Sequence, residues 1–377
     1  MKILHIGKYY WPTPGGIETA VRDVAVEQVR QGHKVWVLAH WQYPGRPAEW
    51  ETREGVNVYR VPIWGHVAYA PLAPSFPRAW QRIVSSVRPD IIHVHMPNLS
   101  PLFPGLCTGK APVVVHWHAD VYTSFKSIPL ALLYPGYAVF QNKLLHKADA
   151  VVATSDAYRQ ASKPLQYFAN KTVVIPLALD PDRMCSDPGS GSVSPRMPFV
   201  LSVGRFTYYK GFEVLIRAAA HLPEEVTVVI AGDGPLSARM RKQIIELDLK
   251  DKLLLPGSLP DEELHALMAQ CSVFCLPSID RTEAFGLVLL EAMHYARPLV
   301  STSVWGSGMQ LVNEHGVTGL CVEPGDEYAL AQALHSLLYN PERARNMGQA
   351  GKKRVQTEFH ISQLVHRLDR LYRRLVS

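Results

Sequence analysis

Short apolar runs alternate with helix-like patterns along almost the whole chain, and this alternation restricts the fold more than any other feature of the sequence. An apolar run at 2–7 is followed by apolar residues at helical spacing over 17–31, and then by a second apolar run at 34–39. Gly32 stands where the helix is expected to end. Strand, helix and strand in this order form a βαβ unit. We therefore expect parallel sheets covered by helices.

The same rhythm continues to the C-terminal region with one interruption. Residues 183–198 are rich in Gly, Ser and Pro and show no periodicity, which is typical of a linker. A chain of 377 residues also exceeds the usual size of a single core. We therefore expect two doubly wound α/β domains, at 1–182 and 199–357. Further strands are expected at 90–96, 112–118, 148–155, 172–179, 199–204, 227–232, 252–257, 272–278 and 298–302.

The C-terminal segment 358–377 is predicted to form an amphipathic helix that packs back on the body of the protein. Its apolar side chains recur at helical spacing, while its arginines fall on the other face and are interpreted as solvated rather than as a nucleic-acid patch. The apolar face comprises Ile361, Leu364, Val365, Leu368, Leu371, Tyr372 and Leu375.

Composition indicates an ordered globular protein of a reducing compartment. Hydrophobic residues make up 47% of the chain and charged residues 19%, as in soluble domains. The five cysteines are scattered without a metal-ligand or disulfide pattern. The chain opens on a strand-like run rather than a signal peptide, so we expect a cytoplasmic protein. The longest uncharged run, 127–142, contains two prolines and falls short of the roughly 20 residues that span a bilayer. We interpret it as core or as a hydrophobic rim, with contact at a membrane surface as the alternative.

The positive charge lies in the first half of the chain. Through Cys185 there are 19 Lys and Arg against 12 Asp and Glu, a balance of +7, and the remainder holds 20 against 21, a balance of −1. A basic half can face phosphorylated ligands, nucleic acid or an anionic membrane surface, or it can be an ordinary solvated surface. No block of Lys and Arg stands out, so we expect no nucleic-acid partner.

Two glutamates flank a predicted strand-to-helix junction in "RTEAFGLVLLEAM". Glu283 precedes the helix and Glu291 lies eight residues later, inside it. Between them, the backbone N–H groups of Phe285, Gly286 and Leu287 stand at the helix start, where an anion can bind. This order suits a ligand with an anionic centre and hydroxyl-rich ends. Taken alone, either glutamate can equally be a residue that complements the helix dipole.

A second loop favours the ligand-binding interpretation of these glutamates. In "GRFTYYKG" (204–211), Arg205 and Lys210 follow the first strand of the second domain and are expected at the same sheet edge as Glu283. Two cations flanked by glycines suit a diphosphate. In the first domain, Gly15 and Gly16 open a helix and allow close approach of a phosphate or sugar, although the spacing is not that of a dinucleotide-binding motif.

These motifs occur together in a known family. The glutamate pair, the "GRFTYYKG" loop, "IAGDGP", "PGGIE" and "VTGLCVEPGD" have the order found in retaining nucleotide-sugar glycosyltransferases of family 4, which have the GT-B fold. The chain resembles this family over nearly its whole length. The resemblance implies two Rossmann-like domains that face each other across a cleft.

The resemblance also implies roles for single residues. Arg205 and Lys210 would neutralise the donor diphosphate, and Glu291 would hold the ribose hydroxyls. Glu283, with the backbone of 285–287, would hold the transferred sugar, and Gly16 would approach the diphosphate from the other domain.

A histidine near the reacting centre is implied as well, and we assign it to His118 in "HWHADVY". His116 is expected to point to the opposite side of its strand and, like His93 and His95, to belong to the core. The family more often has His followed directly by Asp; here Ala119 precedes Asp120, which leaves the role of Asp120 open.

The pair Asp180 and Asp182 has the spacing of a metal-binding DxD motif, with Pro181 between them. We expect no metal there, because Arg205 and Lys210 can carry the charge of the leaving group. No other cofactor is expected.

The predicted function is a retaining hexosyltransferase. Within the family, the motifs look most like bacterial mannosyltransferases of surface-polysaccharide assembly, which implies GDP-mannose as donor and a glycan or lipid-linked glycan as acceptor. Peripheral contact with the inner membrane surface is consistent with such an acceptor. Alternatives are a UDP-sugar donor, a nucleotide-sugar epimerase of the same fold and a non-catalytic glycan-binding module. A glycoside hydrolase is disfavoured, because Glu283 and Glu291 are too far apart to flank one bond.

Overall fold

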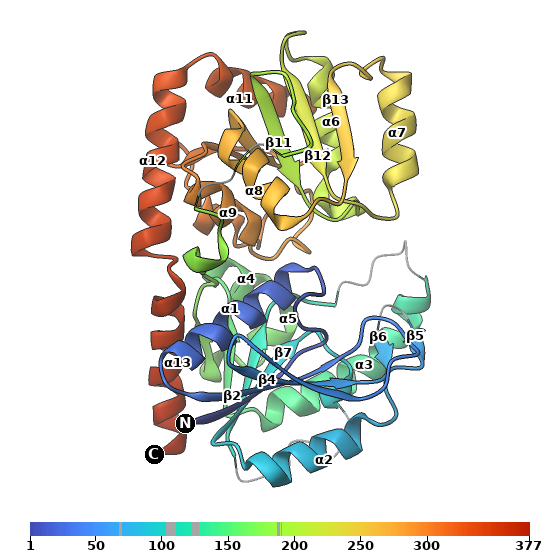
Figure 1. The fold of residues 1–377 in the computed structure, drawn as a ribbon, viewed down its shortest axis with the longest axis vertical. Helices are drawn as coiled ribbons and strands as arrows, with labels where there is room; N and C mark the ends of the chain where they lie inside the picture. Colours follow the sequence, from blue (N-terminus) through green and yellow to red (C-terminus); the bar gives the residue numbers. More distant parts are fainter. Residues whose placement is uncertain (68–69, 103–110, 122–127, 187–188, 190) are drawn as a thin grey trace. The chain divides into compact units, whose positions relative to one another are not determined.

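The computed structural model describes residues 1–67, 70–102, 111–121, 128–186, 189 and 191–377 (Figure 1). The chain forms two compact units. The first comprises Met1–Leu177 and Ile361–Ser377, and the second comprises Ala178–His360. Each unit has its own sheet, which agrees with the expected pair of doubly wound α/β domains.

The first unit is built on a sheet in which eight strands of the described residues have the order β10-β9-β8-β7-β1-β2-β4-β3. Every neighbouring pair is parallel except β3 and β4. The central strands are buried, which explains why they read as continuous apolar runs. The strands are β1 Lys2–Ile6, β2 Lys34–His40, β3 Glu49–Arg53, β4 Val56–Val61, β7 Ile91–Met96, β8 Val113–Trp117, β9 Ala150–Ala153 and β10 Thr172–Val174. A separate hairpin pairs β5 Gly65–Val67 with β6 Ala70–Leu72.

The C-terminal helix α13 (Ile361–Val376) packs on the first unit, as expected, beside α1 (Gly16–Arg30) (Figure 1). Two polar contacts fix it there: the Tyr372 hydroxyl lies 3.4 Å from Gln28 Nε2, and Asp369 pairs with His33 at 2.9 Å. The other helices of this unit are α2 Phe76–Val87, α3 Ile128–Lys147, α4 Asp156–Ala161 and α5 Lys163–Gln166.

The hairpin of β3 and β4 was not predicted from the sequence. Its turn places Glu54 and Gly55 at φ values of 50° and 80°, the left-handed conformation that a two-residue hairpin turn requires. Glycine at position 55 and the alternation of Val56 and Val58 with more polar residues were the available signals. In contrast, β10 is shorter than the apolar run at 172–179 suggested, because it ends at Val174.

The second unit contains a parallel sheet whose described strands have the order β13-β12-β11-β14-β15-β16. The order reverses between β11 and β14, and ligands of open α/β sheets bind at the carboxyl ends of the strands at such a reversal. The strands are β11 Phe199–Val203, β12 Thr227–Ala231, β13 Leu253–Gly257, β14 Val273–Leu276, β15 Leu299–Thr302 and β16 Gly319–Val322. The helices are α6 Phe212–Ala220, α7 Ser237–Glu246, α8 Asp261–Gln270, α9 Leu287–His294, α10 Met309–Val312, α11 Glu327–Leu338 and α12 Pro341–Thr357.

The segment 183–198, interpreted above as a linker, makes its described contacts within the second unit. The backbone N–H of Cys185 donates to His265 Nδ1 at 3.2 Å, and that of Ser192 donates to Glu263 at 3.2 Å.

The uncharged run near residue 130 lies in α3, which contains Pro135. None of the helices in the described ranges is long and apolar enough to cross a membrane. Four of the cysteines are free thiols, and Cys107 lies outside the described residues.

Candidate functional site

The loops that follow β11 and β14 lie against each other, because these two strands are neighbours in the second sheet. Gly211 stands at the turn into α6 with φ 67°, and a side chain there would overlap the carbonyl oxygen of Pro277. The Ile279 N–H donates to the Tyr209 carbonyl across the same contact at 2.8 Å. Glycine at position 211 therefore allows both loops to meet at the sheet edge.

Lys210 and Glu283 form an ion pair at this edge, with Nζ and Oε2 2.5 Å apart and each side chain 12% exposed. Burial by itself lowers the pKa of Lys210, but Glu283, through its charge and its hydrogen bond, outweighs burial together with Tyr209 and Glu291 and raises the pKa above its usual value. The ammonium group is therefore charged at neutral pH. The structure brings together two residues that the sequence placed at one sheet edge.

The loop that carries Glu283 is held in place by hydrogen bonds to the chain around residue 308. The Ser307 hydroxyl donates to the Glu283 carbonyl at 2.5 Å, and the Gly308 N–H donates to the Ala284 carbonyl at 2.7 Å. The Ser278 hydroxyl lies 3.5 Å from the Glu283 carboxylate. The carboxylate is therefore positioned by a fixed backbone.

The helix after Glu283 begins at Leu287, slightly later than the sequence suggested. Gly286 precedes it with φ 81°, a left-handed conformation that glycine adopts without strain. Within the described part of the chain, no hydrogen bond uses the backbone N–H groups of Phe285, Gly286 and Leu287. Three such donors at a helix start can bind an anion.

Glu291 pairs with a cation that sequence reasoning did not identify. Arg183 lies 2.8 Å from it, and the two side chains are 12% and 14% exposed. Arg183 ends "LDPDR", a motif that was read only for its carboxylates. One of these, Asp180, is buried and accepts the Asp182 backbone N–H at 3.1 Å, so it caps the short 3₁₀ turn that carries Arg183.

Arg205 differs from Lys210. Its side chain is exposed, and no carboxylate among the residues that the structure describes pairs with it. Its five N–H donors are thus available to a ligand.

In the first unit, Gly15 and Gly16 lie at the exposed start of α1. A side chain at position 15 would overlap the Glu18 carboxylate, whereas a Cβ at Gly16 would have no described atom within 4 Å. The surface over Gly16 is therefore open to a ligand.

His118 directly follows β8 and is buried, with its backbone N–H bonded to the Met96 carbonyl at 3.0 Å. Its Nε2 lies 2.9 Å from His95 Nδ1. Burial lowers the pKa of His118 to about 3, so the ring is neutral at physiological pH.

The expectation that His116 points away from His118 was wrong. Their rings stack with centroids 4.3 Å apart and planes 13° from parallel. Residues two apart in a strand share a face, and the backbone keeps this alternation through His118. Asp120 accepts hydrogen bonds from the Trp117 indole at 2.9 Å and the Ser162 hydroxyl at 2.6 Å, which gives it a role in holding this loop.

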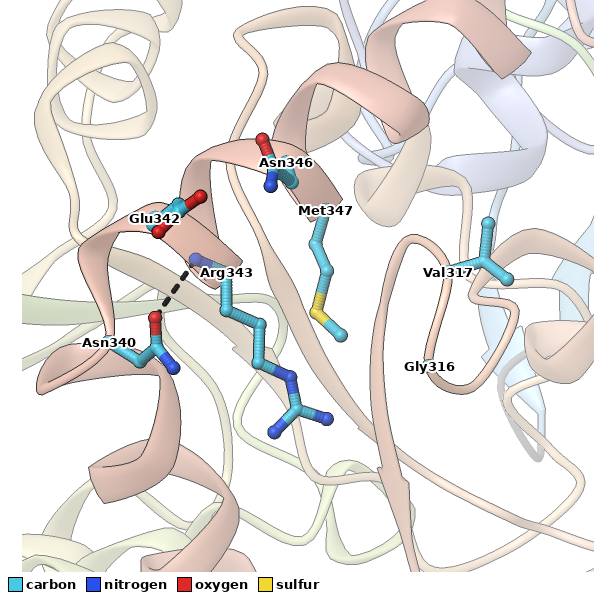
Figure 2. A pocket seen from close by; sticks show the side chains of 7 residues that line it. All are labelled: Gly316, Val317, Asn340, Glu342, Arg343, Asn346 and Met347. Carbon is cyan, nitrogen blue, oxygen red and sulfur yellow. Dashed lines mark hydrogen bonds between the residues drawn. The ribbon is translucent and has the colours of Figure 1, made fainter.

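An open pocket of about 370 Å³ lies elsewhere in the second unit, and none of the candidate residues lines it. Figure 2 shows the side chains that line it. Asn340 caps α12 there by accepting the Arg343 N–H at 3.0 Å. The pocket is lined by Gly316, Val317, Asn340, Glu342, Arg343, Asn346 and Met347.

Solved structures with the same fold cover nearly the whole chain. Sucrose-phosphate synthase from Thermosynechococcus elongatus superposes with a TM-score of 0.80 at 23% identity, covering 99% of this chain and 98% of that one. Anabaena Alr3699/HepE, solved in complex with UDP-glucose, gives a TM-score of 0.77 at 21% identity, covering 98% and 99%. The fold is therefore GT-B.

Sequence comparisons give the family. The model of the glycosyl transferase 4-like domain matches residues 15–178, and that of the glycosyl transferases group 1 matches residues 190–354. The chain is 30% identical to O-antigen chain mannosyltransferase C of Escherichia coli, covering 100% of this chain and 99% of that protein. It is 30% identical to D-rhamnosyltransferase WbpZ of Pseudomonas aeruginosa, covering 95% and 92%. It is 27% identical to a phosphatidyl-myo-inositol mannosyltransferase of Mycobacterium leprae, covering 99% and 96%. The chain therefore belongs to the family 4 glycosyltransferases, with a 4-like domain followed by a group 1 domain.

Proposed function

We propose that this glycosyltransferase moves mannose from GDP-mannose, with retention and without a metal ion, to a glycan or lipid-linked glycan in surface-polysaccharide biosynthesis. The names of two relatives, an O-antigen chain mannosyltransferase and a phosphatidyl-myo-inositol mannosyltransferase, support the sugar and the kind of acceptor. A UDP-sugar is the second candidate donor, because the similarly folded HepE was solved with UDP-glucose.

The observation that carries the proposal is the Lys210–Glu283 pair beside the free N–H groups that open α9. A donor has a dianionic diphosphate between a sugar and a nucleoside. The charged Lys210, the exposed Arg205 and the helix start offer the diphosphate a cation, a planar fork of donors and oriented N–H groups. Glu283 then accepts hydrogen bonds from hydroxyls of the transferred sugar.

Glu291 is assigned to the ribose hydroxyls, and Arg183 orients its carboxylate. In the first unit, Gly15 and Gly16 offer backbone to the diphosphate, and His118 is assigned to the neighbourhood of the reacting carbon. These assignments follow the motif positions of the family.

Catalysis in this account rests on charge stabilisation. As the bond between the sugar and the phosphate loosens, negative charge develops on the diphosphate, where Lys210 and Arg205 stabilise it. The acceptor oxygen then attacks the same face of the sugar and forms the new glycosidic bond as the bond between the sugar and the phosphate breaks. The hydroxyl proton passes to the departing diphosphate. Preorganised charge of this kind contributes more than a mobile solvent shell, because the groups are already oriented when the charge develops.

We also propose that α3 meets the surface of the inner membrane or the lipid of the acceptor. Leu132, Leu133, Val139 and Phe140 expose large apolar side chains on this helix, and Lys143 lies over the Phe140 ring. Apolar side chains beside a cation suit an anionic lipid surface. Flotation with anionic vesicles tests this: the full chain floats, and Leu132→Ser with Leu133→Ser reduces flotation. Equal flotation of both proteins contradicts the assignment.

The experiment that tests the function offers the full chain GDP-mannose, UDP-glucose and UDP-N-acetylglucosamine, with glycan and lipid-linked glycan acceptors. Nucleoside diphosphate release and product mass are followed with and without EDTA, and NMR gives the anomer of the product. The expected result is acceptor-dependent release of GDP that EDTA does not reduce, with the donor anomer retained. Interconversion of donors without an acceptor identifies an epimerase, and binding without turnover identifies a glycan-binding module.

A further inference from the structure

Five buried histidines line one face of the first sheet. The parallel register pairs His5 with His93 and His95 with His116, and paired residues of parallel strands point to the same face. The rings of neighbours lie 4.3 to 5.6 Å apart. The set comprises His5, His93, His95, His116 and His118.

Three of these rings form a hydrogen-bonded chain that begins on α1. Gln28 Oε1 lies 2.7 Å from His5 Nε2. His5 Nδ1 lies 3.0 Å from His95 Nε2, and His95 Nδ1 lies 2.9 Å from His118 Nε2. In both pairs the ring centroids lie 5.2 Å apart, and the planes differ by 22° and 21°. With the joined nitrogens 3.0 and 2.9 Å apart, the rings meet edge to edge; His5 and His95 each use both nitrogens, and His118 uses Nε2.

All three imidazoles are neutral at physiological pH. Burial lowers the pKa of His5 to about 4 and that of His118 to about 3. Burial, with the neighbouring histidines, also holds the pKa of His95 well below its usual value. A neutral imidazole has one N–H and one nitrogen with a free lone pair. Each ring therefore donates a hydrogen bond from one nitrogen and accepts one at the other.

The amide of Gln28 sets that direction. Its oxygen only accepts, so His5 Nε2 carries the proton and His5 Nδ1 accepts from His95 Nε2. His95 Nδ1 then accepts from His118 Nε2. The series of hydrogen bonds ends at His118 Nδ1, which is left with a lone pair. This atom is buried, and no described residue offers it a hydrogen bond.

A hydroxyl on α13 contacts the nitrogen end of the Gln28 amide. Gln28 Nε2 donates to the Tyr372 oxygen at 3.4 Å, and the Tyr372 hydroxyl is hydrogen-bonded to His93 Nδ1. If the hydroxyl proton goes to His93, its oxygen accepts from Gln28, which turns the amide oxygen toward His5. The C-terminal helix thus supports the direction of the chain.

We propose that Gln28 is a positioning residue that fixes the tautomer of His118 through His5 and His95, so that Nε2 carries the proton and Nδ1 presents a lone pair. A lone pair held in a buried site can accept a hydrogen bond from a hydroxyl of the ligand. This catalytic consequence rests on the proposed function, whereas the tautomer itself does not.

The cluster also has the composition of a metal site, since donor atoms of His95, His116 and His118 lie within 4.8 Å of one another. However, metal ligands direct their lone pairs at one point. Here the rings are nearly parallel, and His95 and His118 already share a hydrogen bond. The chain of hydrogen bonds therefore accounts for the arrangement better than a metal does.

Nitrogen NMR of the full chain tests the proposal. The protein is labelled with ¹⁵N-histidine, treated with chelator and recorded at neutral pH, where long-range proton–nitrogen correlations distinguish the two tautomers. Signals are assigned by substituting single histidines. The expected result is a His118 ring protonated at Nε2 alone. A His118 ring protonated at Nδ1 overturns the proposal without any variant at Gln28.

Gln28→Met removes the accepting oxygen at similar volume and is expected to leave His118 as a mixture of tautomers. His116→Leu is the matched control: it removes a buried imidazole of the same cluster that makes no hydrogen bond to any described residue, so it costs stability but keeps the tautomer. Thermal unfolding checks that both variants are folded. An unchanged His118 tautomer in folded Gln28→Met contradicts the role of Gln28.

Turnover separates this inference from the proposed function. Gln28→Met is expected to lower kcat by about tenfold or more with little change in the donor KM, because it weakens a hydrogen-bond acceptor that acts on the reacting hydroxyl. A wild-type chain that shows the expected tautomer but no transfer contradicts the proposed function and leaves the tautomer assignment standing.

Discussion

At the scale of single residues, the two glutamates of "RTEAFGLVLLEAM" each hold a partly buried cation. Glu283 pairs with Lys210 and Glu291 pairs with Arg183. Removing one member of such a pair leaves the other charge without compensation, which costs stability as well as function. Variants at these positions therefore need controls that separate the two effects.

Arg183→Met tests the role that the sequence did not predict. We expect the donor KM to rise about tenfold with little change in kcat, because Glu291 loses the group that orients it while the reacting centre is untouched. Steady-state kinetics measures both constants. Arg217→Met is the control, since it breaks a pair with Glu327 in the same unit and is expected to leave the donor KM unchanged. A normal KM in Arg183→Met removes Arg183 from the site.

Glu283, Glu291, Arg205 and Lys210 could be proposed from sequence because they stand in motifs of regular spacing. The partner of Glu291 could not, because Arg183 lies 108 residues away along the chain. Only tertiary packing brings it close.

At the scale of elements, the site depends on the contact between the loops after β11 and β14. Gly211 makes this contact possible, since its left-handed backbone brings the first loop against Pro277. The sequence predicted these strands well, since a buried parallel strand is a continuous apolar run. It failed at the β3–β4 hairpin, where the largely exposed strand β3 carries a weaker signal.

The predicted orientation of the His116 side chain was also wrong. The alternation rule puts His116 and His118 on one face, and the error came from assuming a break in the strand before His118. The rings then proved to be stacked.

Gly211→Ala is expected to destabilise the second unit by about 3 kcal/mol or more. An alanine is strained at this positive φ, and its Cβ would also overlap the carbonyl oxygen of Pro277. Gly325→Ala is the matched control. Gly325 has φ 85° but no described atom near its would-be Cβ, so about 1 kcal/mol is expected from the backbone alone. Urea unfolding of the full chain compares the two. Equal losses would show that the loop contact contributes nothing.

At the scale of the whole molecule, the two units differ in the number of histidines that they bury. The first unit buries six histidines as neutral rings. One of them is His40, and burial lowers its pKa to about 4. A histidine with a usual pKa of 6.5 in the unfolded chain binds a proton there before it does in the folded chain. The folded state is therefore favoured above pH 6.5 and loses stability as the pH falls toward 4.

Hydrogen exchange of the full chain at pH 7 and pH 5 measures this difference, after correction for the intrinsic dependence of exchange on pH. Peptides from the first unit are expected to lose more protection at pH 5 than peptides from the second, by about 1.4 kcal/mol per pH unit for each histidine that titrates independently. His116→Leu reduces the dependence. Equal loss in both units contradicts the account of the buried histidines.

The most direct test of the central claim, that Lys210 and the start of α9 bind the donor diphosphate, is calorimetric titration of the full chain with GDP. Wild-type protein is expected to bind, and Lys210→Met is expected to weaken binding about tenfold or more, a loss of at least about 1.4 kcal/mol. Lys252→Met is the control, because Lys252 is a buried lysine of the same unit whose ammonium group bonds to the Leu222 carbonyl. The affinity of Lys252→Met for GDP should equal that of the wild type. Undiminished GDP binding by folded Lys210→Met would contradict the claim.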